Sequence, residues 1–196
     1  MTYETVQVRE LEGCGAEVLG LDLKSMSNRQ WDEVQRAFVE HGVIFFRDQN
    51  LTPEQHIEFA QRWGAIDINR YFPAVAGYPM IAEVRKEPKQ EKNIGERWHT
   101  DHTYDQIPAM GSILVARELP SKGGDTLFAN VYRAFETLSE GLKKTLRGLN
   151  AVHSSAHRFG TAARKASGSD LVFHNGDKVG DVLHPVVIRH PLSGRE

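Results

Sequence analysis

The chain has 196 residues, of which 24 are Lys or Arg and 26 are Asp or Glu, so its formal net charge is −2. This length favours a single domain. The balanced charge disfavours a nucleic-acid binder that depends on bulk positive charge, and it disfavours a polybasic membrane anchor. A hydrophobic fraction of 40% and a charged fraction of 26% are ordinary for globular proteins, which argues against disorder over the whole chain.

Cysteine content and hydropathy narrow the class further. The single cysteine, Cys14, excludes an intramolecular disulfide framework and a multi-cysteine zinc or iron–sulfur site. The sequence contains no apolar run of about 18 residues, the length needed to span a bilayer. Its N-terminus lacks the basic and apolar regions of a signal peptide. We therefore expect a cytoplasmic protein that binds neither nucleic acid nor membrane.

The first part of the chain is predicted to alternate short strands with capped helices. Strands are expected over 5–9 and 16–19, on either side of a glycine-containing turn. Ser27 and Gln30 have the spacing of a capping box, and they open a helix that Gly42 ends.

A buried strand and a second helix are expected to follow. The apolar run 43–46 is too short for a helix, so it predicts a buried strand. The next helix has Pro53 at its first position and ends at Gly64.

The later part of the chain is predicted to contain loops, strands and two short helices. Loops are expected over 73–79, over the charged stretch 86–97 and over 157–177. Asn130 and Ser139 are the expected N-caps of the two helices. Further strands are expected over 98–104, 112–116, 126–128, 151–154 and 186–188.

The segment Trp-His-Thr-Asp at 98–101 is the first candidate for chemistry. On a strand, residues i and i+2 point to the same face, so His99 and Asp101 can converge on one metal ion. Imidazole and carboxylate are donors that suit Fe(II), which oxygenases bind with two histidines and one carboxylate. Taken alone, a His-x-Asp pair also fits a strand pair that makes surface hydrogen bonds.

The second candidate is the segment Gly-Gly-Asp-Thr at 123–126. Two glycines permit positive φ, so the structural interpretation is a tight turn that leads into a strand. The hydroxyl of Thr126 could instead donate to an anionic ligand. The other histidines considered, His153, His157, His184 and His190, are expected to have structural or solvated roles.

Taken together, these segments resemble a known family. Residues 43–49, 98–101, 118–120, 123–128 and 184–195 occur in the order and spacing typical of the taurine dioxygenase family of Fe(II)- and 2-oxoglutarate-dependent dioxygenases. The resemblance covers nearly the whole chain. It implies one domain over 1–196, mainly β with flanking helices (α+β), built as a double-stranded β-helix or jelly-roll.

The resemblance also implies the site. His99 and Asp101 would be iron ligands and catalytic residues, and Thr126 would contact the carboxylate of the co-substrate 2-oxoglutarate. The expected reaction is hydroxylation of a small organic acid with O2, with succinate and CO2 as co-products. Family members carry a further histidine ligand and a 2-oxoglutarate-binding arginine beyond the last of these segments, and neither has a match in this sequence. We therefore expect a domain that lacks its C-terminal part.

Substrate identity and activity stay open at this level. Approximate alignment with the family suggests substrate contacts from Asn69, Tyr71, His102 and Tyr104, and it disfavours taurine itself. Sulfonates, sulfate esters and carboxylates remain candidate substrates, and a homo-oligomer is an open expectation. Two other functions are considered: an inactive jelly-roll that serves as a binding module, and a zinc hydrolase that uses the same His-x-Asp ligands.

Overall fold

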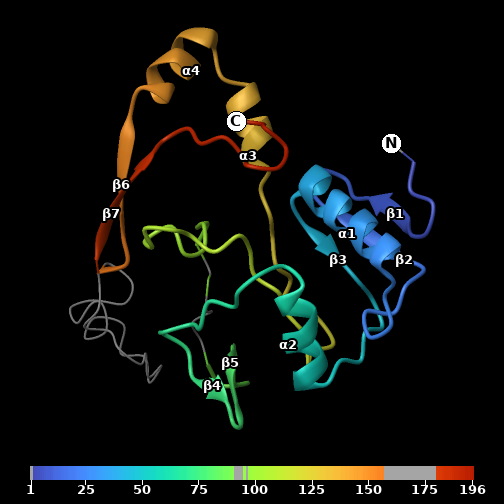
Figure 1. Ribbon diagram of the computed structural model, residues 1–196. Coiled ribbons are helices and arrows are strands. Elements are labelled where there is room, and N and C mark those ends of the chain that lie inside the picture. The colour runs from blue at the N-terminus through green and yellow to red at the C-terminus, as the bar shows by residue number, and fades with distance from the viewer. Residues whose placement is uncertain (1, 91–94, 96, 157–179) are drawn as a thin grey trace. The chain divides into compact units, whose positions relative to one another are not determined.

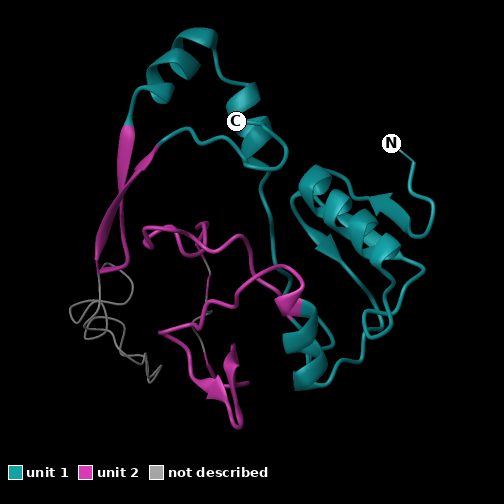
Figure 2. Cartoon of the chain, viewed as in Figure 1, with its two compact units in different colours: residues 1–59, 115–149, 186–196 teal, residues 60–114, 150–185 magenta. Residues whose placement is uncertain are grey.

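The computed structural model describes residues 2–90, 95, 97–156 and 180–196. The described residues form four helices and seven strands in two compact units (Figures 1 and 2). Unit 1 comprises residues 1–59, 115–149 and 186–196, and unit 2 comprises residues 60–114 and 150–185. The expected loop over 157–177 lies outside the described residues.

The helices and strands follow one another along the chain as β1 (Gln7–Glu10), β2 (Ala16–Leu19), α1 (Asn28–His41), β3 (Ile44–Phe45), α2 (Pro53–Gln61), β4 (Ala74–Val75), β5 (Tyr78–Ala82), α3 (Val131–Glu136), α4 (Glu140–Arg147), β6 (Asn150–Ser154) and β7 (Asp181–Pro185).

Local signals place the helices where the sequence predicts them. The Ser27 hydroxyl accepts from the backbone N–H of Gln30, while the Gln30 side chain accepts from the N–H of Ser27, so the capping box is complete. Gly42 ends α1 with φ of 74° and donates its N–H to the carbonyl of Phe38. Asn130 and Ser139 cap α3 and α4, as predicted.

The main hydrophobic core belongs to the N-terminal part of unit 1. Strand β2 pairs antiparallel with β1 and parallel with β3, and α1 packs against this sheet (Figure 1). Val18 of β2 and Val34 of α1 are buried, and Trp31 of α1 packs edge-on against Phe59 of α2. The apolar face of α1 therefore holds the sheet and α2 in place.

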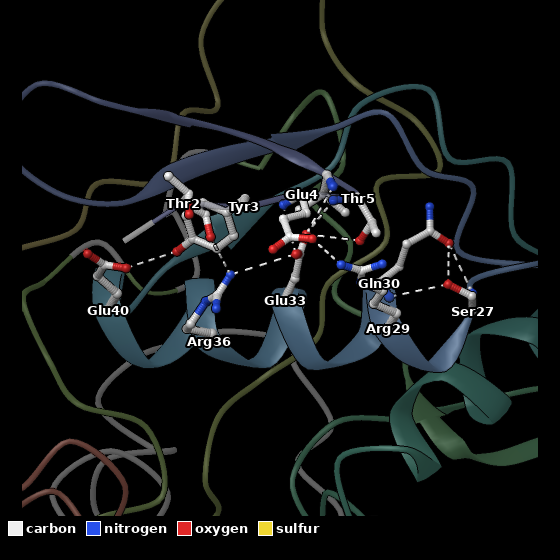
Figure 3. A network of polar contacts seen from close by, with 11 residues as sticks. Thr2, Tyr3, Glu4, Thr5, Ser27, Arg29, Gln30, Glu33, Arg36 and Glu40 are labelled. Carbon is white, nitrogen blue, oxygen red and sulfur yellow. Dashed lines mark hydrogen bonds and ion pairs between the residues drawn. The ribbon is translucent and has the colours of Figure 1, made fainter.

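A buried carboxylate fixes the N-terminal segment to α1 (Figure 3). Glu33 accepts hydrogen bonds from the backbone N–H groups of Glu4, Thr5 and Val6 at 2.8–3.1 Å and from the Thr5 hydroxyl at 2.9 Å. Burial by itself raises the pKa of Glu33, but these hydrogen bonds outweigh it and lower that pKa to about 2.

Unit 2 contains two antiparallel hairpins. In the first, β4 pairs with β5, so the expected loop over 73–79 is wrong in part. Pro79 is compatible with this pairing because each strand of a two-stranded sheet has a free edge that needs no N–H donor. In the second hairpin, β6 pairs with β7, which confirms the strand expected over 151–154.

Four other expected strands are absent from the described residues. Residues 98–104, 112–116, 126–128 and 186–188 have no ladder partner, and residues 101–104 form a turn instead. A β-strand needs a ladder of hydrogen bonds with a neighbouring strand; among the described residues, a single bond from the N–H of Val186 to the carbonyl of Leu149 does not make one. Their apolar side chains are correspondingly exposed, as Leu114, Leu127 and Ile188 illustrate.

The architecture therefore combines helices with small sheets. The α+β character of the expected fold is confirmed. The described strands form one three-stranded and two two-stranded sheets, which are separate from one another, so they do not close a barrel. None of the helices in the described parts of the chain is long and apolar enough to cross a membrane.

Candidate metal and substrate site

The imidazole of His99 and the carboxylate of Asp101 lie side by side in unit 2. Nε2 of His99 is 3.1 Å from Oδ1 of Asp101, and both side chains are more than half exposed. The expected strand does not produce this convergence. Residues 98–100 are irregular and a turn begins at Asp101, so the two groups meet across irregular backbone.

The surroundings of these two residues restrict their orientation. Nδ1 of His99 is 2.6 Å from the carbonyl oxygen of Arg97, so Nδ1 donates its proton there, and Nε2 faces Asp101. The Ser112 hydroxyl donates to Oδ2 of Asp101 at 3.3 Å. Gly95 has φ of 73°, and a Cβ at this position would lie 3.4 Å from Cε1 of His99. A side chain at 95 would therefore adopt a strained backbone conformation, with its Cβ in van der Waals contact with the imidazole.

The donor set fits a divalent metal ion. When the ring is neutral with its proton on Nδ1, Nε2 of His99 and Oδ1 of Asp101 are two acceptors that a shared cation would hold together; when the ring is an imidazolium, Nε2 donates to Oδ1 instead. Two adjacent ligands on an octahedral ion with bonds of about 2.1 Å are separated by about 3 Å, close to the observed separation. A hydrogen bond from the imidazole nitrogen to a backbone carbonyl is also the usual support of a metal-bound histidine.

A second polar cluster in unit 2 surrounds Asp105. One oxygen of Asp105 pairs with Arg70, and the other lies 3.0 Å from Nδ1 of His102. Oδ2 of Asp67 is 3.4 Å from the same nitrogen, so Asp67, His102 and Asp105 hold their ligand atoms within 4.8 Å of one another. Nε2 of His184, on β7, contacts the backbone carbonyl of Asp105 at 3.0 Å.

Aromatic rings border this cluster. The rings of Tyr71 and Tyr104 meet edge-on with centroids 5.6 Å apart, and the ring of His102 lies 5.6 Å from that of Tyr104. Tyr71 is fully buried and donates to the Ser155 hydroxyl at 3.2 Å. Burial, followed by the nearby Tyr71 and Asp105, raises the pKa of Tyr104, so its phenol stays protonated.

The structure thus brings together three of the four expected substrate residues, Tyr71, His102 and Tyr104. The fourth, Asn69, lies in the same segment as Tyr71, and its side-chain oxygen accepts the backbone N–H groups of Tyr71 and Phe72 at 2.9 Å each. Asn69 therefore shapes the turn that carries its neighbours.

Thr126 belongs to unit 1, whereas His99 and Asp101 belong to unit 2. Gly123 and Gly124 have φ of 80° and 82°, so the predicted positive φ is confirmed, but no turn is assigned at these residues and the strand expected after them is absent. The Thr126 side chain is exposed, and its hydroxyl makes no hydrogen bond with any described residue.

Several residues of the Asp105 cluster were not singled out from the sequence. Asp67, Arg70 and Asp105 are not part of any local motif, and the contact between Arg70 and Asp105 spans 35 residues. His184 was expected to be structural, and its contact with the Asp105 carbonyl is of that kind. Only the proximity of His102 and Tyr104 to Asp101 in the sequence could have pointed to this cluster.

Known proteins are similar to this chain in sequence and in structure. The chain matches a crystal structure of a taurine dioxygenase from Burkholderia xenovorans with a TM-score of 0.74 and 29% identity, covering 98% of this chain and 61% of that one. It is 32% identical over 194 residues to an (S)-phenoxypropionate/alpha-ketoglutarate-dioxygenase of Sphingobium herbicidovorans, covering 93% of this chain and 65% of the relative. It is also 32% identical over 185 residues to an alpha-ketoglutarate-dependent sulfate ester dioxygenase of Pseudomonas putida, covering 92% of this chain and 60% of the relative.

The similar proteins named above are all described as dioxygenases. Residues 7–196 match the family described as "Taurine catabolism dioxygenase TauD, TfdA family", and the chain belongs to that family. The resemblance drawn from the sequence motifs is thereby confirmed. The chain spans less than two-thirds of the length of the relatives named above.

Proposed function

We propose that this chain forms part of an Fe(II)- and 2-oxoglutarate-dependent dioxygenase that hydroxylates a small organic acid. The observation that carries the proposal is the pairing of His99 Nε2 with Asp101 Oδ1 at 3.1 Å, in a member of the taurine dioxygenase family. The balanced reaction adds one oxygen atom of O2 to a substrate C–H bond and the other to 2-oxoglutarate, which leaves as succinate and CO2.

The residues of the chain have distinct roles in this proposal. His99 and Asp101 hold the iron, and the carbonyl of Arg97 and the hydroxyl of Ser112 orient these two ligands. Thr126 donates its hydroxyl to a carboxylate of 2-oxoglutarate. When bound, the iron and 2-oxoglutarate supply the oxidising chemistry, while the protein supplies ligand geometry and substrate orientation.

The substrate class is a small anion with an apolar body. The relatives are named for phenoxypropionate, sulfate esters and, in Saccharomyces cerevisiae, sulfonates, all of which carry a carboxylate, sulfate or sulfonate group. We propose that Tyr71, His102 and Tyr104 line the substrate site and that Asn69 shapes it. The free thiol of Cys14 is compatible with the reducing cytoplasm, where we expect the protein to work.

The test of this function measures iron binding and succinate formation in the 196-residue chain and in any longer product of the same reading frame. In the longer product, we expect His99→Ala and Asp101→Ala each to abolish iron binding with the circular dichroism spectrum unchanged, because loss of an exposed ligand opens no apolar cavity. We expect Thr126→Val to weaken 2-oxoglutarate binding more than iron binding. His41→Ala, on α1, is the matched control and should behave as wild type.

Each other outcome points to a different function. A longer product that binds no iron would contradict the proposal and favour the inactive binding module. Zinc-dependent hydrolysis without oxygen uptake would favour the zinc hydrolase. Unfolding of both ligand variants would mean that His99 and Asp101 form a structural pair.

A further inference from the structure

Arg70 lies at the centre of the polar and aromatic cluster of unit 2. One of its terminal nitrogens, Nη2, pairs with Asp105. Its guanidinium carbon is 5.7 Å from the centroid of the Tyr71 ring and 5.9 Å from that of the Tyr104 ring, within the range of cation–π attraction. The guanidinium is therefore bordered by two aromatic rings and held at one nitrogen.

The partner of Arg70 is itself held firmly. Asp105 uses its second carboxylate oxygen for His102, its N–H for the carbonyl of His102 and its own carbonyl for His184, each at 3.0 Å. Since Asp105 is fixed by three contacts besides Arg70, its pairing with Arg70 costs little additional side-chain entropy. Arg70 is thus pre-organised, which favours ligand recognition.

Arg70 has donors left for a ligand. A guanidinium carries five N–H groups, and the hydrogen bond of Arg70 to the described residues uses Nη2 alone. The side chain is 36% exposed, and none of its nitrogens is a buried atom without a partner. The other N–H groups are therefore open to solvent, in the planar arrangement that binds carboxylates and sulfonates with two parallel hydrogen bonds.

We propose that Arg70 binds the anionic group of the substrate and so selects acids over neutral molecules. The inference rests on the proposed function, because it takes the substrate to be an acid. The acidic neighbours do not compete for the open donors: Asp105 is engaged at both oxygens, and Asp67 faces His102. Arg70 is also tied to the turn that directly follows Asp101, because its partner Asp105 donates its N–H to the carbonyl of His102 and so closes the turn over 102–105.

Equilibrium binding to the full chain, measured by calorimetry without iron or 2-oxoglutarate, tests the proposal. The probes are phenoxyacetate, hexanesulfonate and hexyl sulfate, with neutral phenoxyacetamide and hexanol for comparison. Wild type should prefer the anionic probes, and Arg70→Gln should lose roughly tenfold to hundredfold in affinity for them, the loss expected for charge-assisted hydrogen bonds. The affinity for the neutral probes should not change.

Two further variants keep the test independent of folding. Arg70→Lys retains a charge that can pair with Asp105 but lacks the planar fork, so it should fold as wild type and still bind the anions several-fold more weakly. Arg85→Gln removes an exposed arginine of the same unit that pairs with Glu83, and it should bind all probes as wild type does.

The proposal is overturned if wild type shows no preference for the anionic probes, or if Arg70→Gln and Arg70→Lys both bind them as tightly as wild type. Failure of the proposed function is seen separately, as the absence of iron binding and succinate formation in a longer product of the same reading frame. A preference for one anionic probe would identify the headgroup as carboxylate, sulfonate or sulfate.

Discussion

Glu33 makes the attachment of the N-terminal segment depend on pH. Its carboxylate accepts four hydrogen bonds from residues 4–6, and its pKa is about 2 instead of about 4.5. Because the folded state lowers this pKa, the ionised group stabilises the fold fully above pH 4.5. That contribution is lost as the pH falls from about 4.5 to about 2.

We therefore predict that Glu33→Gln lowers the urea midpoint of unfolding at pH 7 and flattens its dependence on pH between 5 and 2. The neutral amide cannot accept four hydrogen bonds as a carboxylate does. Asp32→Asn is the matched control because it removes an exposed carboxylate from the same helix. Parallel pH profiles for wild type and Glu33→Gln would show that Glu33 does not hold the segment.

Contacts within the site could be predicted only between residues that are close together in the sequence. His99 and Asp101 are two positions apart, so a strand and a turn both allow their side chains to meet, and the 3.1 Å separation is compatible with the predicted pair although the predicted strand is wrong. Arg70 and Asp105 meet only through tertiary structure. No spacing rule connects positions that far apart.

At the scale of elements, the capping box of α1 provides a measurable prediction. Ser27 and Gln30 satisfy each other's backbone N–H groups at the start of the helix. We expect Ser27→Ala to lower the free energy of unfolding by about 1 kcal/mol, the usual cost of losing an N-cap. Chemical denaturation measures this change, and Ser25→Ala, in the exposed turn before the helix, should have no comparable effect. Equal losses in both variants would assign the change to the turn.

Helices were predicted well and strands unevenly, for a physical reason. The cap of a helix lies within three residues of its partner, so Ser27, Asn130 and Ser139 carry their signal in the local sequence. A strand depends on a neighbour that is distant in the chain. Leu114 and Ile188 lie in runs with strand propensity, yet no described strand pairs with those runs.

At the scale of the whole molecule, the core and the exposed apolar residues occupy different parts of the chain. The buried apolar residues all lie between Val6 and Tyr71 among those described. The large apolar side chains after residue 97 are mostly exposed, as with Trp98 at 70% and Ile107 at 87%. Exposed large apolar side chains favour association, so the later part of the chain is the part expected to aggregate.

We predict that the 196-residue chain by itself is marginally stable, aggregation-prone and inactive. Each large apolar side chain left in water forgoes roughly 1.5–3 kcal/mol of burial free energy, and a typical domain has only about 5–15 kcal/mol of net stability. A few uncovered side chains therefore equal the whole margin. Size-exclusion chromatography with light scattering should show soluble aggregates that Leu114→Ser, Leu127→Ser and Ile188→Ser together reduce, because these three side chains are exposed. Val34→Ser, in the core, should increase them. A monodisperse wild-type monomer with a sharp, reversible thermal transition would contradict the prediction, since the exposed residues would then be covered in solution.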